Sequence, residues 1–278
     1  MNAPDQYFSD FAHALRYWRG RRGFSQLKLA TEAEISQRHI SFLESGRSQP
    51  SRELILKLGL VLDVPLRHRN AMLLAAGFAP AYQERNLTDP EMAAVRTALE
   101  FMLAQAAPYP ALVVDRLWNL VMANEPAAAM MRFFLGLPPH APIPRDGSVN
   151  VIRMALDPQG LRPCIVNWEE VCADQLQWIA REAMSDGPGS EAQALLVELL
   201  ALPGIEVAAR VPNLERRALP FLPITLRKGD VELNLFTTIT TLGTPRDVTV
   251  HELRLESFFP ADDASAAWFA GRAAQRQA

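Results

Sequence analysis

The sequence predicts an α+β protein with two domains: an all-α array of five short helices, then a larger domain in which helices cover an antiparallel sheet. The 278 residues exceed the usual size of one domain. Apolar residues recur with helical spacing through the first eighty residues. Runs rich in Val, Leu, Thr and Phe, bounded by Gly and Pro turns, follow later in the chain. We expect domains over residues 1–80 and 91–278, joined by a linker over 81–90.

The composition is that of an ordinary globular protein without membrane insertion. Hydrophobic residues make up 49% and charged residues 21%, and no run approaches the roughly 18 apolar residues of a membrane span. The first residues carry no basic segment followed by an apolar one, so we expect no export signal and a cytoplasmic protein. Residues 1–80 hold eleven Lys or Arg and seven Asp or Glu, a net charge of +4. Because the whole chain has a net charge of −3, the remaining residues carry −7. The first domain is therefore the electropositive one.

Helical spacing and capping residues predict the five N-terminal helices. The first helix has an apolar stripe at i, i+4 and i+7, formed by Phe11, Leu15 and Trp18, and should end near Gly23. Ser25 and Ser36 suit the capping positions of the second and third helices. The four later helices are expected over residues 26–33, 37–43, about 54–62 and about 66–76.

The order of polar and apolar residues in this region is specific. The pattern is Phe24-Ser25-Gln26, Leu29-Ala30, Ile35-Ser36, Ile40-Ser41, Leu43-Glu44-Ser45-Gly46-Arg47 and Pro50-Ser51. Over residues 8–77 the chain resembles the phage-repressor or Cro-type helix-turn-helix family, also called the XRE family. The resemblance implies a lambda-repressor-like fold and sequence-specific binding to double-stranded DNA. It also implies a structural pair between Arg19 on the first helix and Glu44 at the end of the third.

The docking geometry of this motif assigns a role to each exposed polar residue, because the third helix lies in the major groove. Arg can bind guanine and Gln can bind adenine through two hydrogen bonds, so Arg38 and Gln37 are the expected base readers. Backbone phosphates are expected at the start of the second helix and in the turn after the third. The predicted DNA-binding set is Gln26, Ser36, Gln37, Arg38, Ser41, Arg47 and Ser48, with Ser36 chiefly a cap. A five-helix module that binds only protein is the alternative.

The second domain begins with two strand-like runs, over residues 111–115 and 118–124, which predict a hairpin. Helices are expected next, over 125–135, 149–156, 167–184 and 191–200. Three strands should follow, over 222–226, 231–240 and 248–258. A strand pair, several helices and then three strands is the order of PAS-like sensor domains, in which a pocket lies between the sheet and its helices.

Several segments of this domain resemble the ligand-binding domain of MmyB-like regulators: the run PYPALVVD over 108–115, Trp118, Asn119, Asn124, the run NVIR over 150–153 and Trp168-Glu169. Residues 253–262 depart from that family's pattern. The resemblance implies a pocket for a small apolar ligand, with fatty acids as the leading class. Large or flexible residues that could line it, or could equally be ordinary core, are Trp118, Met122, Met130, Phe133, Phe134, Trp178, Leu235 and Phe236. Asn124 or Arg153 could anchor a headgroup, although Asn124 could instead cap a helix.

No motif predicts an enzyme, a metal or a cofactor. Cys164 and Cys172 lack metal-ligand spacing, the five histidines are scattered, and Glu169, Glu170 and Asp174 suit an exposed helix face. Two hypotheses remain. One is a regulator that senses a ligand and, as a homodimer on a palindromic operator, changes its DNA binding. The other is a DNA-bound scaffold whose second domain, with a fully packed core, only dimerises or recruits a protein partner.

Overall fold

The computed structural model describes residues 10–144, 147–186, 190–205 and 223–277. The chain forms two compact units. The first contains residues up to Arg85 together with Thr244–His251, and the second contains Asn86–Gly243 together with the residues from Glu252 onward. Among the described residues, no helix is long and apolar enough to cross a membrane.

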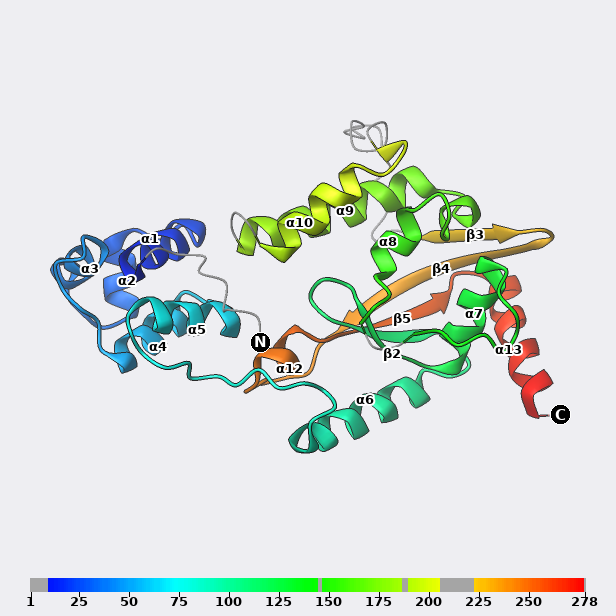
Figure 1. Ribbon diagram of the computed structural model, residues 1–278, viewed down its shortest axis with the longest axis horizontal. Coiled ribbons are helices and arrows are strands. Elements are labelled where there is room, and N and C mark those ends of the chain that lie inside the picture. The colour runs from blue at the N-terminus through cyan, green and yellow to red at the C-terminus, as the bar shows by residue number, and fades with distance from the viewer. Residues whose placement is uncertain (1–9, 145–146, 187–189, 206–222, 278) are drawn as a thin grey trace. The chain divides into compact units, whose positions relative to one another are not determined.

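The first unit contains the five predicted helices (Figure 1). They are α1 (Phe11–Arg21), α2 (Gln26–Glu32), α3 (Gln37–Glu44), α4 (Arg52–Val61) and α5 (Leu66–Ala75). The predicted stripe of α1 is buried, and Trp18 packs in one cluster with Ile40 of α3 and Leu58 of α4. Burial of these apolar side chains, rather than helix propensity, stabilises helices of this length.

Capping residues fix where the helices begin. Ser25 accepts a hydrogen bond from the Lys28 N–H, and Ser36 accepts one from the His39 N–H, so both predicted caps are confirmed. Asp10 and Ser51 cap α1 and α4 in the same way. Each cap satisfies a backbone donor that the helix itself leaves without a partner.

The segment Thr244–His251 belongs to the first unit although it lies between two strands of the second unit in the sequence. Its Asp247 accepts from Arg85 at 3.0 Å, and the Val248 N–H donates to the Gln83 carbonyl at 2.8 Å. The Thr249 hydroxyl donates to the Arg85 carbonyl at 2.7 Å. Residues 83–85 and the segment Thr244–His251 are therefore hydrogen-bonded to each other within the first unit.

The second unit is built on a five-stranded antiparallel sheet. Its strands are β1 (Ala111–Val114), β2 (Leu120–Ala123), β3 (Ile224–Lys228), β4 (Val231–Thr240) and β5 (Arg254–Pro260), in the spatial order β2-β1-β5-β4-β3. The helical elements of the second unit are η1 (Pro90–Met92), α6 (Ala93–Gln105), α7 (Glu125–Leu135), α8 (Val151–Leu156), η2 (Arg162–Cys164), α9 (Trp168–Asp186), α10 (Glu191–Leu200) and α13 (Asp263–Gln277). All but the last residue of α12 (Val248–Glu252) belong to the first unit. The prediction of a PAS-like α+β domain is confirmed.

Both faces of strand β1 are buried, because successive side chains point to opposite sides of a sheet. Val113 packs against Leu99 and Leu103 of α6. Leu112 and Val114 face the other way, into a cluster that includes residues of α8, α9 and α10. Figure 1 shows α6 on one side of the sheet and α8 to α10 on the other. The space between the sheet and this second layer holds the cavity described below.

The C-terminal part differs from the prediction in two places. The β-branched residues from 248 onward predicted a strand, but Val248–Glu252 forms α12, because Asp247 accepts the Thr249 N–H at 2.9 Å and starts a helical turn. Strand β5 begins only at Arg254. Helix α13 was not predicted. The hydroxyl oxygen of its buried Ser265 accepts a hydrogen bond from the Asn234 N–H of β4 at 2.9 Å, which holds the helix against this strand. The first residue of the strand predicted over 222–226 lies in the range 206–222, which is outside the described residues.

Candidate functional site

The third helix of the first unit is held in place by an ion pair. Arg19 donates to Glu44 through Nε at 2.5 Å and through Nη2 at 3.0 Å, and Glu44 is only 4% exposed. The Gln26 side-chain amide donates to the same carboxylate at 2.7 Å. The predicted pairing of Arg19 with Glu44 is confirmed. Together the three side chains tie α1, the start of α2 and the end of α3 to one another.

This arrangement presents the predicted base-reading residues on the outer side of α3. Ile40 and Leu43 are fully buried, whereas Gln37 and Arg38 are exposed and Ser41 is half-buried. The Arg38 guanidinium lies 5.1 Å from the centre of the Phe42 ring on the next turn. A cation held against an aromatic ring keeps its outer N–H groups free to meet a base edge.

The remaining predicted DNA contacts lie at the two ends of this motif. Arg47 is exposed and Ser48 is half-buried, and both backbone N–H groups donate to the Phe42 carbonyl, which fixes the turn after α3. Gln26 is half-buried at the start of α2, and Glu44 occupies one of its two amide hydrogens. Ser36 is exposed, but its hydroxyl oxygen is taken by the helix cap.

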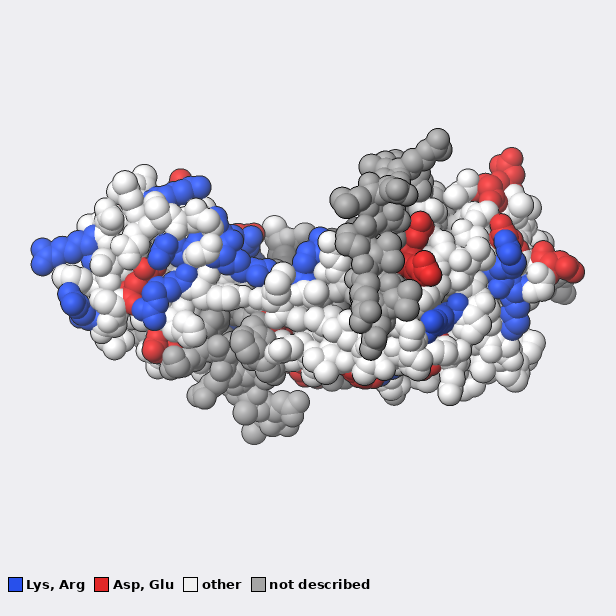
Figure 2. All heavy atoms as spheres, turned by 90° about the horizontal axis from the view of Figure 1, so that it is seen from above, with Lys and Arg blue, Asp and Glu red and all other residues white. Residues whose placement is uncertain are grey.

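The charge predicted for this unit is spread over its surface. Figure 2 shows several separate groups of Lys and Arg side chains on the visible face of the first unit, with fewer Asp and Glu side chains among them. Lys28, Arg38, Arg47 and Arg52 are all exposed. Such a surface attracts phosphate without regard to sequence, whereas sequence-dependent contacts are the predicted role of the exposed polar groups of α3.

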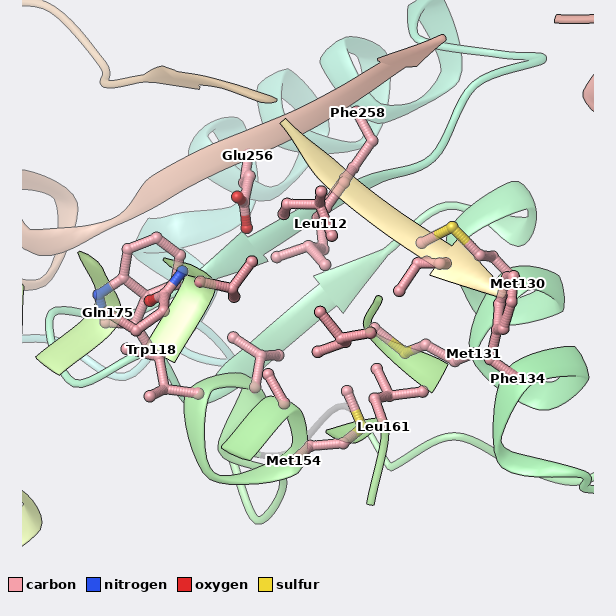
Figure 3. A pocket seen from close by; sticks show the side chains of 17 residues that line it. Leu112, Trp118, Met130, Met131, Phe134, Met154, Leu161, Gln175, Glu256 and Phe258 are labelled. Atoms are coloured by element: carbon pink, nitrogen blue, oxygen red, sulfur yellow. The ribbon is translucent and has the colours of Figure 1, made fainter. Parts of the chain in front are cut away.

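The second unit contains a cavity of about 90 Å³ between the sheet and its helices. Its walls come from β1, β3, β5, α7, α8 and α9, and Figure 3 shows the side chains that line them. Most are apolar and several are flexible. The lining residues are Leu112, Trp118, Met130, Met131, Phe134, Val151, Ile152, Met154, Ala155, Leu161, Ile165, Val171, Gln175, Ile224, Leu226, Glu256 and Phe258.

Three of the ten residues predicted to bind a ligand line this cavity: Trp118, Met130 and Phe134. Neither predicted headgroup anchor lies there. The Asn124 amide is fully used within the fold, since it caps α7 by accepting from the Ala127 N–H and also bonds Leu103, Tyr109 and Ala111. Arg153 points instead toward Glu198 of α10, at 2.5 Å, in a half-exposed ion pair.

The other five predicted residues pack elsewhere in the second unit. Met122 joins the cluster on the α6 side of the sheet, and Phe236 stacks on Phe259 at 5.4 Å. Phe133 lies against Trp268 of α13. The last two lie behind the cavity wall: Leu235 is buried in the cluster that contains Met130 and Phe134, and Trp178 meets the Trp118 ring edge-on at 5.8 Å.

The polar groups of the cavity were missed from the sequence. Glu256 of β5 is 6% exposed, and burial raises the pKa of its carboxyl to about 7, an effect that a hydrogen bond with Thr237 partly opposes. The Gln175 carbonyl oxygen and the Trp118 indole N–H are buried without a hydrogen-bond partner. A signal was present: Glu256 stands between Leu255 and Phe258 in a strand, inside the run 253–262 that departs from the MmyB-like pattern.

Trp118 is held in a conformation that non-glycine residues rarely adopt, with φ +66°. Asp115 accepts the N–H groups of Leu117 and Asn119 and so closes the turn before and after it. Asn150 donates to the Leu117 carbonyl, and the Trp118 carbonyl accepts from the Val151 N–H at 2.9 Å. Strain of this kind, about 1–3 kcal/mol, persists where surrounding contacts over-determine it and is frequent at binding sites.

An exposed, basic helix-turn-helix and a separate domain built around an apolar cavity define a class of protein: a DNA-binding transcription regulator with its own ligand-binding domain. Two family comparisons agree. Residues 15–68 match the family described as helix-turn-helix, and residues 95–270 match the MmyB-like transcription regulator ligand binding domain. Since the second match covers more than half of the chain, the protein belongs to the MmyB-like transcription regulators. These are families of regulators and not of enzymes. A comparison with curated proteins gives no match.

Proposed function

We propose that this protein is a cytoplasmic sensor whose chain carries both the DNA-binding and the ligand-binding domain. A small apolar molecule with a fatty-acid-like body occupies the cavity and controls how a homodimer of the protein binds a palindromic operator. The observation that carries the proposal is the cavity itself, inside the ligand-binding domain, with a lining that is almost wholly apolar. Three of its side chains are methionines, whose flexibility allows a cavity to adapt to a chain-like ligand.

The cavity favours this sensor over a DNA-bound scaffold. A domain that only dimerised or recruited a protein would be expected to have a fully packed core, because unfilled space forfeits contact energy. A void lined by Trp118, Met130 and Phe134 instead suits a ligand that supplies the missing contacts when it binds.

A homodimer follows from the single helix-turn-helix motif in each chain. Motifs of this type bind two half-sites about one helical turn apart, and two-fold protein symmetry matches a palindromic site. Strand β5 carries Glu256 and Phe258 to the cavity and is reached directly from Thr244–His251, the segment that pairs with residues 83–85. We propose that a ligand-dependent shift of β5 changes the half-site spacing through this segment.

The ligand is tested by native mass spectrometry of the purified protein, followed by organic extraction. We expect an apolar small molecule to leave with denaturation of the wild type, and to be absent from an Ala155→Phe variant, in which a phenyl ring fills the cavity. An Ala129→Ser variant, changed outside the cavity lining, should retain it. An empty wild-type protein that also fails to bind added apolar chains would contradict the sensor and favour the scaffold.

Base reading is tested with Arg38→Ala. Loss of a bidentate base contact should weaken binding to the operator by about 1–3 kcal/mol and leave binding to random DNA nearly unchanged. Lys57→Ala is the matched control, because it also removes one positive charge from the first unit but lies on α4, paired with Glu34. Fluorescence anisotropy with both DNAs at one salt concentration gives the comparison. Equal losses on the two DNAs would show that Arg38 contacts phosphate only.

A further inference from the structure

The cavity is polar at one end only. In Figure 3, Glu256, Gln175 and Trp118 lie on one side, whereas Met130, Met131 and Phe134 lie on the opposite side. Glu256 extends from β5 toward the interior of the cavity (Figure 3). This division suits a ligand with an apolar body and a single polar end.

The polar end offers both acceptors and a donor. The Gln175 carbonyl oxygen is an acceptor without a partner, and the Trp118 indole N–H is a donor without a partner. The Glu256 carboxyl adds further acceptor oxygens. A buried polar group without a hydrogen-bond partner is energetically unfavourable. A ligand that supplies the missing hydrogen bond should therefore bind about tenfold or more tightly than one that does not. A hydroxyl group donates once and accepts twice, so it can meet an acceptor and a donor at once.

A carboxylate fits this end poorly. It has no hydrogen to give to Gln175, and it would place a second acidic group beside Glu256. Among the described residues that line the cavity, none is basic. The nearest basic residue on the same face of β5 is Arg254, and it is committed to Glu182 at 2.5 Å and to the Arg116 carbonyl at 3.0 Å. Arg153 of α8 lies outside the lining and is paired with Glu198 through Nη2 at 2.5 Å, although its buried Nε has no partner. A buried anion without a cation is strongly disfavoured.

We infer that the polar end of the ligand is one uncharged hydrogen-bond donor, as in the hydroxyl of an aliphatic alcohol, and that the cavity discriminates against carboxylates of the same chain length. This inference rests on the proposed function and narrows it, because it assigns the fatty-acid-like body of the ligand a neutral head. The raised pKa of Glu256, about 7, supports it, since a protonated carboxyl can also donate to the hydroxyl oxygen.

The test compares three probes of equal chain length against the full-length protein: octanol, sodium octanoate and methyl octanoate. Binding is followed at neutral pH by calorimetry and by fluorescence of the tryptophans, one of which lines the cavity. We expect octanol to bind about tenfold more tightly than octanoate or the ester, since neither of the latter donates a hydrogen bond. The ester separates the loss of the donor from the presence of charge.

Two variants test whether the preference for octanol over octanoate comes from the polar end of the cavity. Glu256→Gln, which keeps the shape of the side chain, should let octanoate bind more tightly and reduce the preference for octanol to about threefold or less. Met130→Leu, at the apolar end, should change all three affinities by a similar factor. Circular dichroism checks that each variant is folded.

The results distinguish a failure of the neutral head from a failure of the sensor function. Octanoate binding to the wild type as tightly as octanol overturns the inference and leaves the apolar sensor standing. A preference for octanol that Glu256→Gln does not alter also overturns the assignment to this end. Failure of all three probes to bind counts against the proposed function itself.

Discussion

Arg19→Met is expected to destabilise the DNA-binding unit by about 3 kcal/mol. As a result, the variant should lose operator binding at temperatures at which the wild type is still folded and bound. The change removes the only cation paired with Glu44 among the described residues, and that carboxylate is 4% exposed. Removing one partner of a buried pair leaves a charge that water cannot reach, at a penalty of about 3–5 kcal/mol, and the partial exposure of Arg19 argues for the lower end. Thermal and urea unfolding, read from far-ultraviolet circular dichroism, measure the loss.

A double variant separates this electrostatic penalty from lost packing. Arg19→Met with Glu44→Gln carries no buried charge, so it should recover a large part of the stability that Arg19→Met loses. Lys57→Met breaks an exposed ion pair with Glu34 in the same unit and should change unfolding little. If Arg19→Met and Lys57→Met unfolded alike, Glu44 would not depend on Arg19 for its burial.

The first unit was predictable because its signals are local. Ser25 and Ser36 satisfy N–H groups three residues later, and the stripe of Phe11, Leu15 and Trp18 needs only the helical period. These short-range rules place Gln37 and Arg38 outward without knowledge of any distant residue. The outward placement of Gln37 and Arg38 therefore followed from the sequence.

The ligand cavity could not be predicted in the same way, because its walls come from six elements spread over residues 112–258. Residue type alone does not say which large apolar side chain faces a void and which packs against a neighbour. Phe134 and Phe133 are adjacent, yet only Phe134 reaches the cavity, while Phe133 packs on Trp268 of an unpredicted helix.

The two predicted headgroup anchors lie outside the cavity lining for one physical reason. Asn124 and Arg153 are polar residues beside predicted core, and both find partners inside the protein, at a helix cap and in an ion pair. A polar side chain whose hydrogen bonds are already made has little to offer a ligand. The useful polar groups are those that the fold leaves unsatisfied in the cavity lining, and only the three-dimensional arrangement identifies Gln175 and Trp118 as such. Arg153 has a buried Nε without a partner as well, but it lies outside the lining and its Nη2 is paired with Glu198.

Glu256→Gln is expected to stabilise the second unit relative to the wild type at pH 8, by roughly 3 kcal/mol, and to leave its stability nearly unchanged at pH 4.5 and below. Burial raises the pKa of this carboxyl from its ordinary value of 4.5 to about 7 in the folded protein. Below 4.5 both the folded and unfolded states hold the proton, so the carboxyl causes no penalty. Between 4.5 and 7 the folded state keeps a proton that the unfolded state has lost, so wild-type stability falls as the pH rises.

Above pH 7 the whole penalty is present, and a shift from 4.5 to about 7 corresponds to roughly 3 kcal/mol. The amide of Glu256→Gln has no proton to lose, so the gap between variant and wild type should open across this interval and then stay constant. Urea unfolding at several pH values measures it. The control is Glu232→Gln, an exposed residue of the neighbouring strand β4 paired with Arg227, which should show no such opening. Parallel stability curves for Glu256→Gln and the wild type would mean that the carboxyl is ionised in the cavity at no cost, so burial in this cavity could not be the reason for rejecting a ligand carboxylate.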